Sequence, residues 1–390
     1  MKKLFCLVAI LSMNYCRAQP NSGKISADIK GLGNDTVYVF YYPLSKSDRV
    51  KGEWVKRDTL TAKNNVFIYQ LQISEPVAVA IIPQKSFYKR VSGGLYLPQT
   101  KFIELFVSPG DHVRIKADLG RYYVNYSMKG SLINESISKN RESFKMPSIE
   151  AVKVELQIDS LTGMEGKKAE IAKLFERRGE MQNKISKAKL QFIDKHLNND
   201  LAAYYLTTQS PEKFLEYYSK LTEKAKNGLF SYKLKAIYQD FLNYTAATAA
   251  EKELTAGKPA PHFSLMGVDG KLISLAQFKG NYIVLDFWGT WCGPCMNELP
   301  NLKAVVEKYN ATVKFVGIAC QENEKKWKKV IDEQQLGWTQ LINSDENDVS
   351  VLYGVRAFPT KIIIDKDFNI VKRFVGLTED FYKTLDDLHK

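Results

Sequence analysis

The sequence is poor in cysteine and histidine, and it lacks long apolar runs. Its 390 residues include five cysteines and four histidines. The histidines are widely separated and show no metal-ligand spacing, so we predict no metal and no cofactor. After the N-terminal segment, no run approaches the roughly 20 apolar residues of a membrane-spanning helix. Low-complexity tracts and repeats of solenoid length are also absent, which leaves an ordinary globular chain.

The length and the composition favour several domains. A chain of 390 residues with 45% apolar and 25% charged residues is that of a soluble protein, but it is too long for one ordinary domain. We therefore expect two or three compact units.

The N-terminus has the features of a secretory signal peptide. Lys2 and Lys3 precede an apolar stretch at residues 4–13, and Cys16-Arg17-Ala18 offers a cleavage point after Ala18. We predict a signal peptide at residues 1–18 and a periplasmic mature protein. An uncleaved or lipid-bearing N-terminus that uses Cys16 is the alternative, which the bulky Tyr15 disfavours.

The remaining cysteines indicate reactivity. Removal of Cys6 and Cys16 with the signal peptide would leave Cys292, Cys295 and Cys320. One close pair and one extra thiol do not make a disulfide-stapled scaffold in an exported protein of this size. We infer that the close pair reacts.

Positive charge is confined to the first two thirds of the chain. The net charge is +13, yet residues 257–390 hold 17 basic and 17 acidic side chains, so the excess lies before them. We interpret it as a solvated lysine-rich surface and expect no nucleic acid partner. Attraction to anionic membranes or acidic partners is the minority interpretation.

Residues 19–130 have the pattern of a small β-sandwich or barrel. Short β-branched and aromatic runs alternate there with Gly, Pro, Asn and Asp, and His112 is interpreted as an ordinary strand residue. The expected strands include residues 36–42, 66–71, 77–82, 102–107 and 112–115.

Residues 131–256 have a helical period instead. Apolar residues from Ile171 to Phe192 fall largely three, four or seven apart, and Ser210-Pro211 begins a further helix. We interpret this region as a helical domain or linker that helps to position or dimerise the molecule. Residues 257–261, Gly-Lys-Pro-Ala-Pro, break the helix and mark the next boundary.

Residues 257–390 alternate strands with helices, which indicates an α/β sheet with a mixed or antiparallel edge. Within them, the apolar run Ile283–Trp288 leads through a turn to Trp291-Cys292-Gly293-Pro294-Cys295. Cys292 falls where a helix begins, so free backbone N–H groups and the helix dipole favour its thiolate. This is the pattern of a redox dithiol. A zinc half-site would need two more ligands, and no suitable spacing exists.

The C-terminal third resembles the thioredoxin-like domain of the TlpA/ResA family of exported thiol-disulfide oxidoreductases. The motifs that carry the resemblance are residues 257–263, 285–295, 298–300 and 353–360. The region before it resembles a β domain of unknown function that often precedes such domains, through Val107–Asp111 and Lys129-Gly130-Ser131. The fold expectation is a thioredoxin-like α/β fold at the C-terminus, after a small all-β domain and a helical segment.

The position of the two cysteines suggests their order of reaction. We expect Cys292 to be the exposed thiol that attacks first and the more buried Cys295 to resolve the mixed disulfide. Pro294 fixes the first helical turn, and Gly293 leaves room for a partner chain.

Two carboxyls are candidates for proton handling. Asp286 matches the buried aspartate of thioredoxin, and Glu298 matches the active-site glutamate of the ResA type. A buried carboxylate with a raised pKa can take the proton of Cys295. The presence of both departs from the ResA-like pattern, so the sequence leaves open which one works. An exposed acid in the first helical turn is the alternative interpretation of Glu298.

The resemblance also implies a substrate surface. Phe358-Pro359-Thr360 matches the family's cis-proline loop, which would lie beside Cys292 and pair with a substrate strand. Trp288 and Trp291 would shield the sulfurs, although Trp288 also suits the core. Cys320 is expected to be an inert buried thiol.

We therefore predict an exported enzyme that reduces disulfides in exported proteins and receives electrons from a membrane thiol donor, with a homodimer left open. Two alternatives remain from other classes. One is a peroxiredoxin, although no Thr-x-x-Cys follows the first long strand. The other is a partner-binding scaffold formed by residues 19–256 with a secondary redox site.

Overall fold

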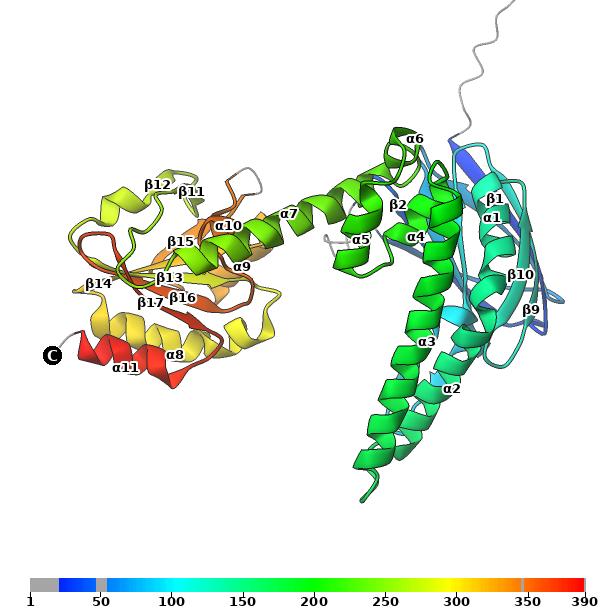
Figure 1. The fold of residues 1–390 in the computed structure, drawn as a ribbon, viewed down its shortest axis with the longest axis horizontal. Helices are drawn as coiled ribbons and strands as arrows, with labels where there is room; N and C mark the ends of the chain where they lie inside the picture. The colour runs from blue at the N-terminus through cyan, green and yellow to red at the C-terminus, as the bar shows by residue number, and fades with distance from the viewer. Residues whose placement is uncertain (1–20, 47–54, 345–346, 389–390) are drawn as a thin grey trace, which may run out of the picture. The chain divides into compact units, whose positions relative to one another are not determined.

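The computed structural model describes residues 21–46, 55–344 and 347–388. The expected signal peptide, with Cys6 and Cys16, lies outside them. The chain forms two compact units, of which the first ends at Tyr238 and the second is Gln239–Lys390 (Figure 1). The described part contains no helix that is both long and apolar enough to cross a membrane.

The first unit is built on two four-stranded sheets and a small hairpin. The sheets have the strand orders β10-β9-β1-β4 and β3-β2-β5-β8, and β6 pairs with β7. Their strands are β1 (Ser22–Lys30), β2 (Thr36–Pro43), β3 (Lys56–Thr61), β4 (Val66–Gln72), β5 (Val77–Pro83), β6 (Tyr88–Lys89), β7 (Leu95–Tyr96), β8 (Ile103–Val107), β9 (His112–Leu119) and β10 (Val124–Lys129).

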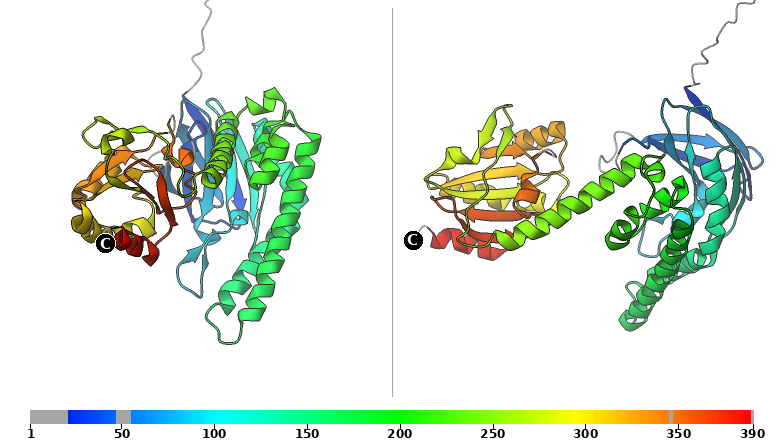
Figure 2. Two further views of the ribbon diagram at one scale, coloured as in Figure 1. Left: turned by 60° about the vertical axis from the view of Figure 1, so that its left-hand side comes forward. Right: turned by 45° about the horizontal axis from the view of Figure 1, so that its top comes forward.

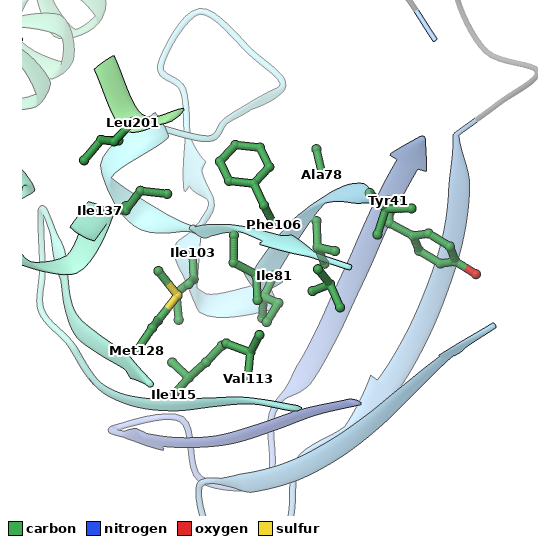
Figure 3. Close-up of a cluster of buried hydrophobic side chains, with 14 of the residues drawn as sticks. Tyr41, Ala78, Ile81, Ile103, Phe106, Val113, Ile115, Met128, Ile137 and Leu201 are labelled. Atoms are coloured by element: carbon green, nitrogen blue, oxygen red, sulfur yellow. The ribbon is translucent and has the colours of Figure 1, made fainter. Parts of the chain in front are cut away.

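The two larger sheets bury one shared core. Alternate residues of β1 are buried, as a strand with one face in the core requires. Figure 3 shows Ile81 and Ile103 of one sheet and Val113 and Ile115 of the other within the same cluster. Strand β5 is buried along nearly its whole length, and Phe106 of the neighbouring β8 packs against Tyr204 and Phe230 from the helical part of the unit.

Helices of the first unit complete this core rather than forming a separate one. Ile137, Ile193, Leu201 and Phe214 belong to the same buried cluster as the strands. The helices are α1 (Leu132–Asn140), α2 (Lys145–Leu161), α3 (Lys168–Lys195), α4 (Asp200–Leu206), α5 (Pro211–Tyr218), α6 (Glu223–Lys226) and α7 (Ser231–Glu253), with short 3-10 helices at Gln84–Ser86, Gln99–Lys101 and Arg141–Phe144.

Helix α1 is hydrogen-bonded to the edge of a sheet, whereas α2 and α3 pack mainly against each other. The buried Asn134 of α1 accepts a hydrogen bond from the backbone N of Phe106 at 2.9 Å and donates one to its carbonyl at 2.6 Å, which closes the outer edge of β8. Helices α2 and α3 run side by side and extend beyond the sheets (Figures 1 and 2). Because α3 has few partners there, Phe175 of its predicted apolar stripe is exposed.

The second unit is a seven-stranded mixed sheet of order β12-β11-β15-β14-β13-β16-β17. Strands β13, β14 and β15 are parallel, and the other pairs are antiparallel. Its strands are β11 (Ser264–Gly267), β12 (Leu272–Ser274), β13 (Tyr282–Trp288), β14 (Val313–Ala319), β15 (Thr339–Ile342), β16 (Thr360–Ile364) and β17 (Ile370–Val375). Its helices are α8 (Gly293–Tyr309), α9 (Glu324–Glu333), α10 (Val349–Leu352) and α11 (Glu379–Asp387), with a 3-10 helix at Leu275–Phe278.

Helices α8 and α11 cover one face of this sheet (Figure 1). Val284 of β13 and Ile363 of β16 pack there against Leu302 of α8 and Phe381 of α11. The central parallel strands, the flanking antiparallel strands and the helix after β13 confirm the predicted thioredoxin-like fold, and the sheets of the first unit confirm the predicted β domain.

Helix α7 contains the division between the units, whereas the sequence placed a boundary at Gly257. The second half of α7 belongs to the second unit and packs within it against Gly354, where φ is +64°. A Cβ on Gly354 would lie 2.4 Å from the backbone N of Glu251 and 2.8 Å from the carbonyl O of Ala247. Only glycine lets the two backbones approach this closely.

We expect Gly354→Ala to lower the free energy of unfolding by about 1–3 kcal/mol, because the backbone of α7 cannot move aside as a flexible side chain could. Its positive φ adds to the cost. Denaturant unfolding measures the effect. Gly337→Ala is the matched control, since an added Cβ there meets nothing within 4 Å. Equal shifts in both variants would contradict this account of the contact.

Candidate active site

The site forms where β13 ends and α8 begins. Strand β13 is almost fully buried and delivers the chain to the turn at residues 289–291. Cys292 is the N-cap of α8, and its sulfur accepts a hydrogen bond from the backbone N of Cys295 at 3.2 Å. The two cysteines form a disulfide. The predicted placement of the pair at a helix start is therefore confirmed.

The exposure of Cys292 was predicted wrongly. Cys292 is 4% exposed and Cys295 is 3% exposed, so burial does not distinguish the two sulfurs. Both pack with Trp288, Leu299 and the fully buried Trp327 of α9. This apolar cover reaches the N-cap itself, which the position of a residue at a helix start does not reveal.

Exposed residues surround the buried disulfide. Trp291 is 46% exposed, and Gly293 and Pro294 are also exposed. An added Cβ on Gly293 would meet nothing within 4 Å, as expected for a position that leaves room for another chain. These three residues therefore form the exposed surface next to Cys292.

A second loop holds the turn before Cys292 in place. The carboxylate of Glu322 accepts hydrogen bonds from the backbone N of Thr290 at 2.6 Å and from its hydroxyl at 2.9 Å. The indole N–H of Trp291 donates to the carbonyl of Cys320 at 3.0 Å. The loop that follows β14 thus fixes both residues of the approach to the dithiol.

The Phe358–Pro359 peptide bond is cis, as the resemblance predicted. Phe358 packs against the cluster that contains both cysteines, and its ring meets that of Trp291 edge-on at 5.3 Å. Pro359 itself is buried. The structure therefore brings this loop and the cysteine pair together.

A buried ion cluster lies behind the dithiol. Asp286 is 5% exposed, Glu298 is 6% exposed and Lys361 is 1% exposed. The ammonium of Lys361 lies 2.5 Å from Oε2 of Glu298 and 3.1 Å from Oδ1 of Asp286. The hydroxyl of Tyr382 donates to Oε1 of Glu298 at 2.9 Å. Glu298 is therefore not the exposed first-turn acid of the alternative interpretation.

These groups perturb one another. Burial raises the pKa of Asp286, which Glu298 raises further and Lys361 partly offsets. Burial alone would lower the pKa of Lys361, but Asp286 and Glu298 outweigh it and the pKa is raised. Burial, then Glu298, raises the pKa of Tyr382. Lys361 is accordingly a cation between two carboxyls at neutral pH.

The remaining candidates lie outside this cluster. Cys320 is fully buried, and burial raises the pKa of its thiol well above the usual value, as suits the predicted inert role. Trp288 is buried among the cysteines, so it is both a core residue and a cover for the sulfurs. Within the described ranges, no group of three or more His, Cys, Asp or Glu could hold a metal ion.

The sequence reasoning missed Lys361, Tyr382 and Glu322. Lys361 did carry a signal, because a lysine that begins the apolar run Ile362–Ile364 is rarely buried unless it is paired. Tyr382 and Glu322 lie far from Cys292 in the chain and show no local pattern.

Fold and site together define a thioredoxin-like thiol-disulfide oxidoreductase. Residues 256–373 match the profile of the AhpC/TSA family. The chain is 31% identical over 137 residues to "Thiol-disulfide oxidoreductase ResA" of Bacillus thuringiensis (strain Al Hakam). The aligned region covers 35% of this chain and 79% of that protein. It is 29% identical over 173 residues to the protein of that name in Halalkalibacterium halodurans. That aligned region covers 43% of this chain and 98% of the other protein. Through its C-terminal domain the chain belongs to the ResA-like thiol-disulfide oxidoreductases.

Among solved structures, the chain resembles the thioredoxin domain of a thiol-disulfide oxidoreductase from Bacteroides vulgatus. The identity is 28% and the TM-score is 0.32, with 35% of this chain and 98% of that chain covered.

Proposed function

We propose that this enzyme is exported to the periplasm and reduces disulfides in other exported proteins. The observation that carries the proposal is a Cys-Gly-Pro-Cys pair at a helix N-cap with a buried carboxyl of raised pKa, Asp286, behind it. The proposal treats Cys292 and Cys295 as the reacting residues and Asp286 and Glu298 as the two candidates for proton handling. Trp291, Gly293, Pro294, Phe358 and Pro359 form the surface for the substrate chain.

The proposed reaction has two exchange steps. The Cys292 thiolate attacks a substrate disulfide, and one substrate sulfur leaves as a thiolate. Cys295 then loses its proton and attacks the sulfur of Cys292, which releases the second substrate thiol. The substrate gains two electrons, and the enzyme is left with its own disulfide. A membrane thiol donor would return the enzyme to the dithiol.

Export is supported by the signal-peptide pattern of residues 1–18. Oxidation of the dithiol and its renewal by a donor also suit a compartment outside the reducing cytosol. Retention at the membrane through Cys16 is the alternative to cleavage after Ala18.

The reduction potential tests the direction of electron flow. We expect equilibration with glutathione buffers to give a value close to that of thioredoxin, about −270 mV, because the Gly-Pro dipeptide and the acid pair resemble the reducing members. Alkylation of free thiols followed by mass measurement gives the dithiol fraction at each buffer ratio. A value near that of a strong oxidant, about −120 mV, would overturn the reductase assignment.

A peroxiredoxin activity is less compatible with the site. The residue three positions before Cys292 is Gly289, so the Thr-x-x-Cys arrangement of a peroxidatic cysteine is missing there, and the thiol of Cys320 is fully buried with a raised pKa. The partner-binding role of residues 19–256 stays a prediction.

A further inference from the structure

One row of side chains crosses the catalytic sheet behind the dithiol. Lys361 of β16 pairs in register with Asp286 of β13, Asp286 with Gly317 of β14, and Gly317 with Gln340 of β15. Residues paired in this way point to the same face of a sheet. This face is the one on which α8, and therefore Cys295, packs. Lys361 lies two residues after Pro359 and enters the row from the cis-proline loop.

The two carboxyls that meet Lys361 are not equivalent. Glu298 has a donor on each oxygen, namely the ammonium of Lys361 on Oε2 and the hydroxyl of Tyr382 on Oε1. Two donors satisfy Glu298 as a carboxylate. Asp286 has the ammonium 3.1 Å from Oδ1, but no aligned hydrogen bond reaches this oxygen from any residue that the structure describes. Asp286 is thus the carboxyl with room to take up a proton.

Among the described residues, Asp286 and Glu298 are the charged groups that act on the ammonium of Lys361. Helix α11 contributes Tyr382 and the ring of Phe381, whose centroid lies 5.5 Å from the ammonium. Strand β17 contributes Phe374, and β15 contributes the neutral amide of Gln340, which fills the space above Gly317. Cys295 is the cysteine of α8 on the same face.

We propose that Lys361 is a positioning residue for the exchange reaction, which holds Glu298 in an ion pair and so leaves Asp286 to take and return the proton of Cys295. This inference rests on the proposed function and extends it. During resolution the S–H proton of Cys295 passes to the Asp286 carboxylate, and the Cys295 sulfur bonds to that of Cys292. The bond from Cys292 to the substrate breaks, and the substrate sulfur leaves with the electron pair. The cluster changes from a net charge of −1 to 0.

The sign of the effect of Lys361 follows from Coulomb's law. Without the ammonium, two buried carboxylates would face each other, so Asp286 would hold its proton to higher pH. A protonated Asp286 cannot accept the proton of Cys295. An opposite charge at this distance lowers the pKa of a carboxyl by roughly 1–3 units. At each pH unit below that pKa, the fraction of Asp286 that is deprotonated, and so able to accept a proton, falls about tenfold.

The test uses the full-length reduced protein and a chromogenic aromatic disulfide, with stopped-flow detection of the released aromatic thiol from acid to alkaline pH. The first phase reports attack by Cys292, and the second reports resolution by Cys295. The rate of the second phase is expected to rise with pH as Asp286 loses its proton. For Lys361→Met we expect this rise, the carboxyl limb of the pH profile, to occur about 1–3 pH units higher, while Lys361→Arg restores the wild-type position. Lys372→Met is the matched control, because Lys372 pairs with Asp380 on the protein surface. An unshifted limb in folded Lys361→Met, or an equal shift in the control, would overturn the proposal.

Two further variants decide the case if Lys361→Met does not fold. Asp286→Asn should lose the carboxyl limb and leave only the slow rise from ionisation of the Cys295 thiol. Glu298→Gln should keep the carboxyl limb, moved to lower pH, because Lys361 would then serve Asp286 alone. The reverse pattern would overturn the proposal. A wild-type enzyme that shows this limb but does not reduce protein disulfides would count against the proposed function alone, since the probe is a small disulfide.

Discussion

Cys292→Ser is expected to abolish catalytic reduction of protein disulfides, with a loss on the order of 10³-fold or more. The variant keeps the N-cap, because a serine hydroxyl also accepts the hydrogen bond from the backbone N of Cys295. It cannot form the mixed disulfide, because oxygen has no counterpart to thiol–disulfide exchange. Turbidity from reduced insulin chains measures the turnover.

Cys320→Ala is the control for this experiment. Cys320 is buried on the opposite face of the sheet, in the cluster of Leu285 and Phe287, and only its backbone carbonyl contacts the approach to the dithiol. We expect its turnover to stay close to that of the wild type. Activity that survives in Cys292→Ser but disappears in Cys320→Ala would place the reacting thiol elsewhere.

Cys295→Ala should stop the reaction after its first step. Cys292 can still attack a substrate disulfide, but no neighbouring thiol can release the product, so the covalent complex accumulates. We expect turnover to fall as far as in Cys292→Ser, while complexes that disappear on addition of reductant become visible on non-reducing gels. Mass spectrometry of these complexes would identify the substrates.

The double variant Cys292→Ser/Cys295→Ala separates this trap from other adducts. It lacks both sulfurs of the pair, so it should form no such complex. Complexes of equal abundance in the double variant would show that another cysteine captured the partners, and the assigned order of reaction would then be wrong.

Local patterns predicted much of the fold. The runs at 36–42 and 66–71 became β2 and β4 because β-branched and aromatic residues alternate there between a core face and an outer face. The position of Cys292 at a helix start was also readable, since a turn and Pro294 follow a buried strand.

Contacts between distant segments could not be read in this way. Lys361 meets Glu298 across 63 positions of the chain, and nothing around either residue names the other. The burial of Cys292 depends on Trp327 and Leu336, which arrive from later elements. The sequence therefore identified two carboxyls but left their roles open, because the cation that distinguishes them comes from another strand.

The fit of α7 against Gly354 has a consequence for how this enzyme can be divided or recombined. The hydroxyl of Tyr244 and the carboxylate of Glu251 in α7 accept hydrogen bonds from the guanidinium of Arg356, three residues before Pro359. A gene fragment that starts at the Gly257 break would omit this helix and leave Arg356 without these acceptors. A fragment that is meant to carry the complete catalytic domain should therefore begin at Gln239 or earlier, and a fusion to another N-terminal domain should join the two chains before that residue.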